Sequence, residues 1–115
     1  AVNQDDHVKN ISFIMDRTGK WSLSPAYDIT FSYNPTNKWL RAHQMSVNGK
    51  TLGIGYPDLM EAGNKMGIKA RRCSNIISEV EAAIAEFQVI ANQVHIKEKT
   101  FEYINKVINE NKILK

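Results

Sequence analysis

The beginning of the chain holds its densest group of side chains that could do chemistry. Within the stretch "QDDHVKN", Asp5 and Asn10 are five positions apart. Kinase-type phosphoryl-transfer enzymes use such a pair on one loop. The carboxylate accepts a hydrogen bond from the substrate hydroxyl, and the amide oxygen coordinates magnesium. The spacing alone is a weak signal, because many proteins contain an aspartate and an asparagine at this separation by chance.

A β-hairpin is expected to follow this loop. Ile11, Phe13 and Met15 fall on one face of an extended segment, with Ser12 and Asp16 on the other, and a turn with a glycine occupies residues 16–20, which is the pattern of two short antiparallel strands. If Asp16 and Lys20 close the turn, the numbers of paired residues sum to 36, and Ile11 lies opposite Pro25. The hairpin then returns the chain to within about 5 Å, one strand spacing, of the end of the loop.

The returning strand brings a second acid toward the loop. Asp28 comes three residues after Pro25 and is therefore expected at the same end of the hairpin as Asn10. In kinase-type enzymes an aspartate in this position is the second magnesium ligand. Both residues offer the hard oxygen atoms that magnesium prefers. The loop, the hairpin and the returning acid together are a stronger signal than the spacing of the pair.

The second half of the chain has a helical pattern. Pro57 suits the first turn of a helix with an apolar stripe that includes Leu59 and Met66, and Gly67 suits its end. Apolar residues at helical spacing from Cys73 to Ala91 predict a long second helix, and a third is expected over about 97–112. In the first half, Asn48-Gly49 predicts a tight hairpin turn. We therefore expect an α+β fold, mostly α, with an N-terminal β-hairpin followed by about three helices.

Length and composition limit the other possibilities. The chain has 115 residues, enough for a single domain over 1–115. Its single cysteine, Cys73, excludes an internal disulfide, and no apolar run approaches the ~18 residues of a membrane span. The net charge of +3 and the short basic cluster at Lys69, Arg71 and Arg72 give only weak support for nucleic-acid binding. His43 and His95 are interpreted as surface or hydrogen-bonded histidines, not as metal ligands.

Two motifs make the first half of the chain resemble a known family. The loop Asp5-Asp6-His7-Val8-Lys9-Asn10 follows a D-x-H-x-K-N pattern, and Leu23-Ser24-Pro25-Ala26-Tyr27-Asp28 follows an L-x-P-x-Y-D pattern. In residue type and separation, both are similar to the catalytic loop and metal-binding segment of HipA-like serine/threonine kinases, the toxins of bacterial type II toxin–antitoxin pairs. The later segment "HQMSVNGK" resembles the same family.

The resemblance implies a role for each motif residue. Asp5 would be the catalytic general base, and Asn10 and Asp28 would hold Mg²⁺ on the phosphates of ATP. His7, Lys9 and Tyr27 would lie near the nucleotide. Asp6 is the rival for the base, but it lies four residues before Asn10, one fewer than the kinase spacing requires.

The resemblance also implies an architecture and partners. Residues 1–55 would form the catalytic loop, hairpin and metal-binding segment, and residues 56–115 the helical part, of a protein-kinase-like C-terminal lobe. The chain has no glycine-rich loop and no strand lysine before its acids, so we expect a C-terminal fragment that starts at the catalytic loop and has no kinase activity alone. A HipB-like DNA-binding antitoxin, an aminoacyl-tRNA synthetase as the type of protein substrate, and a cytoplasmic location are implied in the same way.

A different class of function stays open at this point. The chain could be a small, mostly helical module that binds protein or nucleic acid without catalysis, with an incidental polar N-terminus. The basic residues from Lys69 to Arg72 or the helix faces would then carry the interaction. The gene sequence upstream of Ala1 discriminates the two interpretations, because only a kinase would carry a glycine-rich loop and a strand lysine there.

Overall fold

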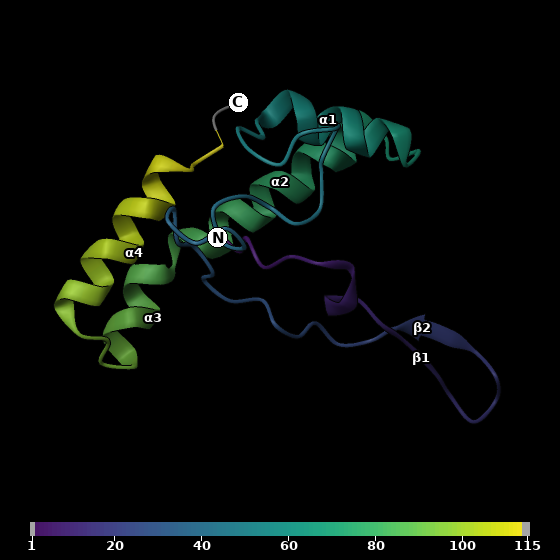
Figure 1. The fold of residues 1–115 in the computed structure, drawn as a ribbon. Coiled ribbons are helices and arrows are strands. Elements are labelled where there is room, and N and C mark those ends of the chain that lie inside the picture. Colours follow the sequence, from purple (N-terminus) through teal and green to yellow (C-terminus); the bar gives the residue numbers. More distant parts are fainter. Residues whose placement is uncertain (1, 114–115) are drawn as a thin grey trace.

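The computed structural model describes residues 2–113, which form a short β-hairpin followed by helices (Figure 1). The fold class is the expected one, α+β and mostly α. Within the described residues the elements are, in order, a 3₁₀ turn η1 (Val8–Asn10), β1 (Phe13–Met15), β2 (Trp21–Leu23), α1 (Tyr56–Lys65), α2 (Ala70–Ala85), α3 (Phe87–Gln93) and α4 (Glu98–Glu110).

The hairpin has the predicted register. β1 and β2 are antiparallel, and the backbone N–H of Asp16 donates to the carbonyl of Lys20 at 3.0 Å to close the turn. The carboxylate of Asp16 also accepts hydrogen bonds from Thr18 and from the backbone of Lys20. The paired residues are Phe13 with Leu23, Ile14 with Ser22, and Met15 with Trp21.

The hairpin does not pack on the helices. It projects from the rest of the molecule (Figure 1), and every residue of both strands is exposed. Its cross-strand pairs place Phe13, Met15, Trp21 and Leu23 on one face. The alternation in the sequence therefore predicts correctly which side chains share a face of the hairpin, but that face is open to solvent.

The ends of α1 lie where the sequence predicts them. Pro57 is in the first turn, and the helix stops before Gly67, whose φ of +74° is a conformation that favours glycine. The backbone N–H of Ile68 then donates to the carbonyl of Gly63 at 2.9 Å. Met66 was expected on the apolar stripe of this helix but follows its last turn and is exposed.

The predicted long second helix is divided. α2 ends at Ala85 and α3 begins at Phe87, with Glu86 capping both. No proline or glycine lies near this junction, so the residue types do not indicate the break. Cys73 and Ile77 are buried on the face of α2 that contains the predicted stripe, and α2 packs against α1.

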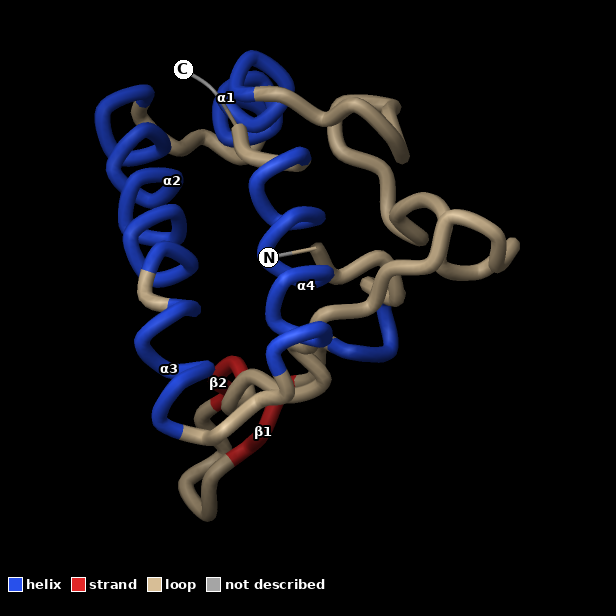
Figure 2. Tube along the Cα trace, turned by 90° about the vertical axis from the view of Figure 1, so that its left-hand side faces the viewer, coloured by secondary structure: helices blue, strands red, loops and turns tan. Residues whose placement is uncertain are grey.

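The last two helices pair with each other. α3 packs against α4, and the rings of Phe87 and Phe101 stack with their centroids 5.6 Å apart. Figure 2 shows α3 continuing the column of α2, with α4 beside them. No helix within residues 2–113 is both long and apolar enough to cross a membrane.

Candidate functional site

The two sequence motifs meet at the base of the hairpin. The hydroxyl of Tyr27 donates to the backbone carbonyl of Lys9 at 2.7 Å. Beyond the strands, the backbone N–H of Ser24 donates to the carbonyl of Ser12 at 2.9 Å. The fold therefore brings the end of the loop against the segment that contains Asp28, as the hairpin argument predicts.

The start of the chain is tied to the segment that follows the hairpin. Asn3 forms a parallel bridge with Ser32, and the N–H of Gln4 donates to the carbonyl of Ser32 at 2.8 Å. The side-chain amide of Asn3 donates to the backbone carbonyl of Asp28 at 3.2 Å. Residues on both sides of the hairpin thus hold the loop and the segment that contains Asp28 in one region.

Asp5 presents its carboxylate outward. Its side chain is 52% exposed, and its Oδ1 lies 3.9 Å from the Nε2 atom of His7. The other ring nitrogen of His7, Nδ1, is buried and has no hydrogen-bond partner among the described residues. Buried polar atoms are nearly always paired in folded proteins, so the unpaired ring nitrogen is unusual, whereas the exposed carboxylate of Asp5 is open to a ligand.

Asn10 is oriented by the backbone of the loop. Its Nδ2 donates to the carbonyl of Asp5 at 2.9 Å. This bond uses the amide nitrogen, and no residue within 2–113 donates to the Oδ1 atom. The oxygen that a cation would use is therefore free, while the same side chain fixes the spacing between Asp5 and Asn10.

Asp28 adopts an unusual backbone conformation. Its φ is +58°, in the left-handed region that aspartate and asparagine tolerate better than most residues. Its side chain is exposed, and its carboxylate has no hydrogen bond or ion pair with any residue that the structure describes. Asn10 and Asp28 thus offer one amide oxygen and one carboxylate without competing partners, and this donor set fits magnesium. No cluster of three or more His, Cys, Asp or Glu suited to a metal occurs within residues 2–113.

Asp6, the rival for the catalytic base, has a different environment. Its Oδ2 lies 2.8 Å from Nδ1 of His43, and its Oδ1 accepts the backbone N–H of Gln44 at 2.7 Å. Burial opposes ionisation of Asp6, but the hydrogen bonds from His43 and Gln44 outweigh it and hold the pKa of the carboxyl below its ordinary value. Both oxygens are therefore engaged, which leaves Asp5 as the acid with an open carboxylate.

The partner of His43 could not be predicted from the sequence. His43 is hydrogen-bonded, as interpreted, but its partner lies 37 residues away in the loop. No spacing rule for helices or hairpins connects two positions so far apart. The only indication in the sequence is that Asp6 is an acid beside the expected catalytic acid.

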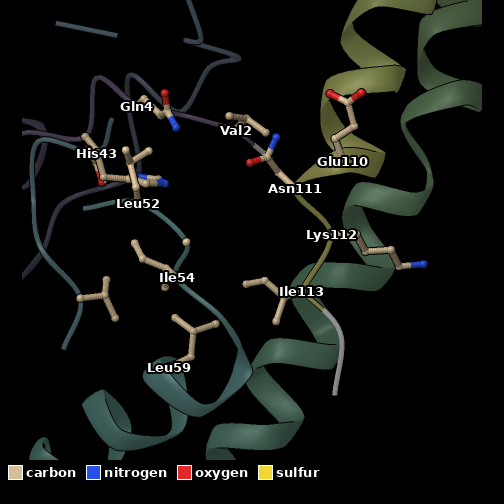
Figure 3. Close-up of a pocket in the computed structure, with 13 residues that line it drawn as sticks. Val2, Gln4, His43, Leu52, Ile54, Leu59, Glu110, Asn111, Lys112 and Ile113 are labelled. Atoms are coloured by element: carbon tan, nitrogen blue, oxygen red, sulfur yellow. The ribbon is translucent and has the colours of Figure 1, made fainter. Parts of the chain in front are cut away.

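A pocket of about 440 Å³ lies behind the loop (Figure 3). Val2, Gln4, His43 and Leu52 lie on one side of it and Ile113 lies across from them, and Asp6 is also part of the lining. Alternate residues of an extended segment point in opposite directions, so Asp5 lies on the other side of this segment. The pocket therefore backs the candidate catalytic residue without containing it.

The basic cluster that could have bound nucleic acid is exposed at the start of α2. Lys69 caps the helix, and Arg71 follows within its first turn. Arg72 is paired with Glu79, with Nη1 2.8 Å from Oε1. Because one of the three cations is already paired with an acid, the cluster offers less free positive charge than the sequence suggests.

Comparison with known proteins identifies the same family as the two motifs. The family model described as HipA-like C-terminal domain matches residues 1–87. The match includes the loop, the hairpin, α1 and α2. No curated protein and no solved structure matches the chain.

Proposed function

Because the chain belongs to the family of HipA-like C-terminal domains, we propose that it is the C-terminal portion of a serine/threonine kinase. The kinase transfers the γ-phosphate of ATP to a protein hydroxyl. The observation that carries the proposal is the contact between the two motifs, made by the hydroxyl of Tyr27 and the carbonyl of Lys9 at 2.7 Å. This contact supports the proposal because Lys9 and Tyr27 are the direct neighbours of the proposed metal ligands Asn10 and Asp28.

Each residue of the proposed site has a defined task. The exposed carboxylate of Asp5 accepts the proton of the substrate hydroxyl and orients its oxygen toward phosphorus. Asn10 and Asp28 hold Mg²⁺, which when bound neutralises charge on the ATP phosphates. His7, Lys9 and Tyr27 lie near the nucleotide.

The toxin role and the partners are part of the same proposal. We propose that the kinase is a cytoplasmic toxin that is neutralised by a HipB-like DNA-binding antitoxin. The family match supports this proposal. An aminoacyl-tRNA synthetase is the proposed class of substrate.

Sequencing the gene upstream of Ala1 tests the kinase assignment, because a glycine-rich loop and a strand lysine in frame support it. A start codon directly before Ala1 favours a binding module instead.

The metal site can be tested on the 115-residue chain itself. Titration with Mn²⁺ and ATP should broaden the NMR signals of Asn10 and Asp28 before those of the helices. Asp28→Asn removes the charged ligand but keeps a residue that tolerates the left-handed backbone at this position, and it should abolish the broadening. Asp16→Asn is the matched control in the turn of the same hairpin and should leave the broadening unchanged. Uniform broadening in all three chains would contradict the site.

The catalytic assignment gives a separate expectation. These 115 residues contain no element that covers the phosphates, so purified chain should not turn over ATP above background. A coupled ATPase assay and a phosphate-release assay measure this directly. Clear turnover that is lost in Asp5→Asn would show that the chain is sufficient for catalysis and would overturn the predicted inactivity.

A further inference from the structure

Two contacts fasten the middle of the loop to a distant segment. Asp6 uses both carboxylate oxygens, one with Nδ1 of His43 at 2.8 Å and one with the backbone N–H of Gln44 at 2.7 Å. Hydrogen bonds to an ionised group are stronger than those between neutral groups. We call the contacts among Asp6, His43 and Gln44 the loop clamp.

The clamp matters because the packing that buries Val2 and Gln4 does not extend to Asp6, which lines a pocket. Gln4 and Asp6 are among the residues that line the pocket of about 440 Å³, and Figure 3 shows Gln4 and His43 at this pocket. On the other side, the side chain of Asp5 is 52% exposed, and its Oδ1 lies 3.9 Å from Nε2 of His7. The clamp therefore fixes the direction of the Asp6 side chain, while the side-chain amide of Asn10 holds the backbone carbonyl of Asp5.

We propose that His43 is a positioning residue for the catalytic loop. By holding the carboxylate of Asp6 toward the pocket, it turns the side chain of the adjacent Asp5 to the opposite side, where the substrate hydroxyl would bind. The direction follows from the alternation of side chains along an extended segment. His43 does not touch the reacting atoms, and it acts only through Asp6.

This inference deepens the proposed function and rests on it for the role of Asp5. The clamp itself stands on geometry alone. It is also not implied by the family pattern, because D-x-H-x-K-N leaves the position of Asp6 unspecified. The test is therefore made without ATP or metal, so that its result and the result for the kinase proposal can differ.

The experiment compares three variants of the 115-residue chain by NMR. His43→Asn keeps an amide nitrogen close to the position of Nδ1, His43→Gln moves that nitrogen outward, and His43→Ala removes it. Two signals report on the loop: the backbone amide of Gln44, which donates to Asp6, and the side-chain amide of Asn10, which donates to the carbonyl of Asp5. Hydrogen exchange of the first and chemical shift of the second are measured, together with the shifts of Asp5.

We expect His43→Ala to lose the protection of the Gln44 amide from exchange and His43→Asn to restore it. In His43→Ala the Gln44 amide should exchange about tenfold faster or more, because local opening becomes easier when a charge-assisted bond is lost. The signals of Asp5 and Asn10 should move or broaden. His43→Asn should restore exchange to within about threefold of the unaltered chain, and His43→Gln should not.

A remote histidine provides the control for a general loss of stability. His95 lies in the turn between α3 and α4 with a φ of +55°, so His95→Ala introduces backbone strain there. It should lower the melting temperature without moving the signals of Asp5 or Asn10. If His95→Ala perturbs the loop as His43→Ala does, or if His43→Ala leaves Asp5 unmoved, then His43 does not position the loop. Equal effects of His43→Asn and His43→Ala would also overturn the proposal.

Discussion

At the scale of single residues, Asp58 has a carboxylate that is both buried and hydrogen-bonded by several neighbours. It is 5% exposed although it is charged, and it accepts hydrogen bonds from the N–H of Gly55 and Nζ of Lys50, each at 2.9 Å, and from Asn48 at 3.2 Å. The backbone of Gly55, then Lys50 and Asn48, lower the pKa of Asp58 to about 2. One carboxylate thus joins the Asn48-Gly49 turn to the start of α1.

This carboxylate makes stability depend on pH. The pKa of Asp58 is about 2 in the folded chain and 3.8 ordinarily, so the unfolded chain binds the proton more tightly. The stabilisation is therefore complete above about pH 4 and is lost as the pH falls through about 2. When urea midpoints are measured from pH 2 to 7, the midpoint should decrease as the pH is lowered from about 4 to about 2. Asp58→Asn should lower the midpoint at pH 7 and should reduce its further decrease between pH 4 and 2.

A second aspartate gives the control for Asp58. The hydroxyl of Thr18 and the backbone of Lys20 lower the pKa of Asp16 as well, but its turn belongs to the exposed hairpin. Asp16→Asn should therefore leave the helical unfolding transition in place at pH 7. A profile for Asp58→Asn that falls between pH 4 and 2 as steeply as that of the unaltered chain would contradict the assignment.

At the scale of elements, the sequence correctly predicts the strand register and helix ends that neighbouring residues determine. The register of β1 and β2 follows from the residues that close the turn, and the ends of α1 follow from Pro57 and Gly67. The junction at Glu86 has no such local cause. The contact of Asp6 with His43 is also not local, since it depends on how separate segments are placed in space.

The contact between α1 and α2 depends on a glycine. A Cβ atom added at Gly63 would lie 2.5 Å from Sγ and 3.3 Å from Cβ of Cys73, which forces the two helices apart. Gly63→Ala should therefore lower the free energy of unfolding by about 1–3 kcal/mol, although alanine favours the helix by up to about 1 kcal/mol. Urea denaturation followed by circular dichroism measures the change.

Removing the sulfur should relieve the clash. Cys73→Ala alone leaves a small cavity, but when it is combined with Gly63→Ala the added methyl group occupies part of the space that Sγ held. The two substitutions should therefore be less destabilising together than the sum of the single effects, because residues in contact are coupled. Strict additivity would mean that Gly63 and Cys73 do not constrain each other.

At the scale of the whole molecule, the described chain is open. Its Cα radius of gyration is 16.1 Å, whereas a compact domain of this length would have about 13 Å. Buried apolar side chains among residues 2–113 are limited to Val2, Cys73, Ile77, Ala91 and Val107. The sequence could not show this openness, because an apolar stripe predicts which side of an element is apolar but not which surface covers it.

The hairpin gives the clearest test of this open architecture. Phe13, Met15 and Trp21 are 63%, 56% and 64% exposed, so they contribute little to the folding of this chain. Replacing all three by threonine keeps good strand formers and should change the free energy of unfolding by about 0.5 kcal/mol or less. The same variant should bind less of a hydrophobic dye such as ANS, because the largest apolar side chains of the exposed face are gone.

A buried residue is the control for this hairpin variant. Ile77→Thr places a hydroxyl on the buried face of α2 and should cost about 1–3 kcal/mol, with no loss of dye binding at the hairpin. Urea denaturation and dye fluorescence are measured on both variants. A loss of more than about 2 kcal/mol in the hairpin variant would exceed what surface substitutions cost. It would mean that this face is packed in solution, against a second copy or against the helices. The hairpin would then not project freely from the molecule.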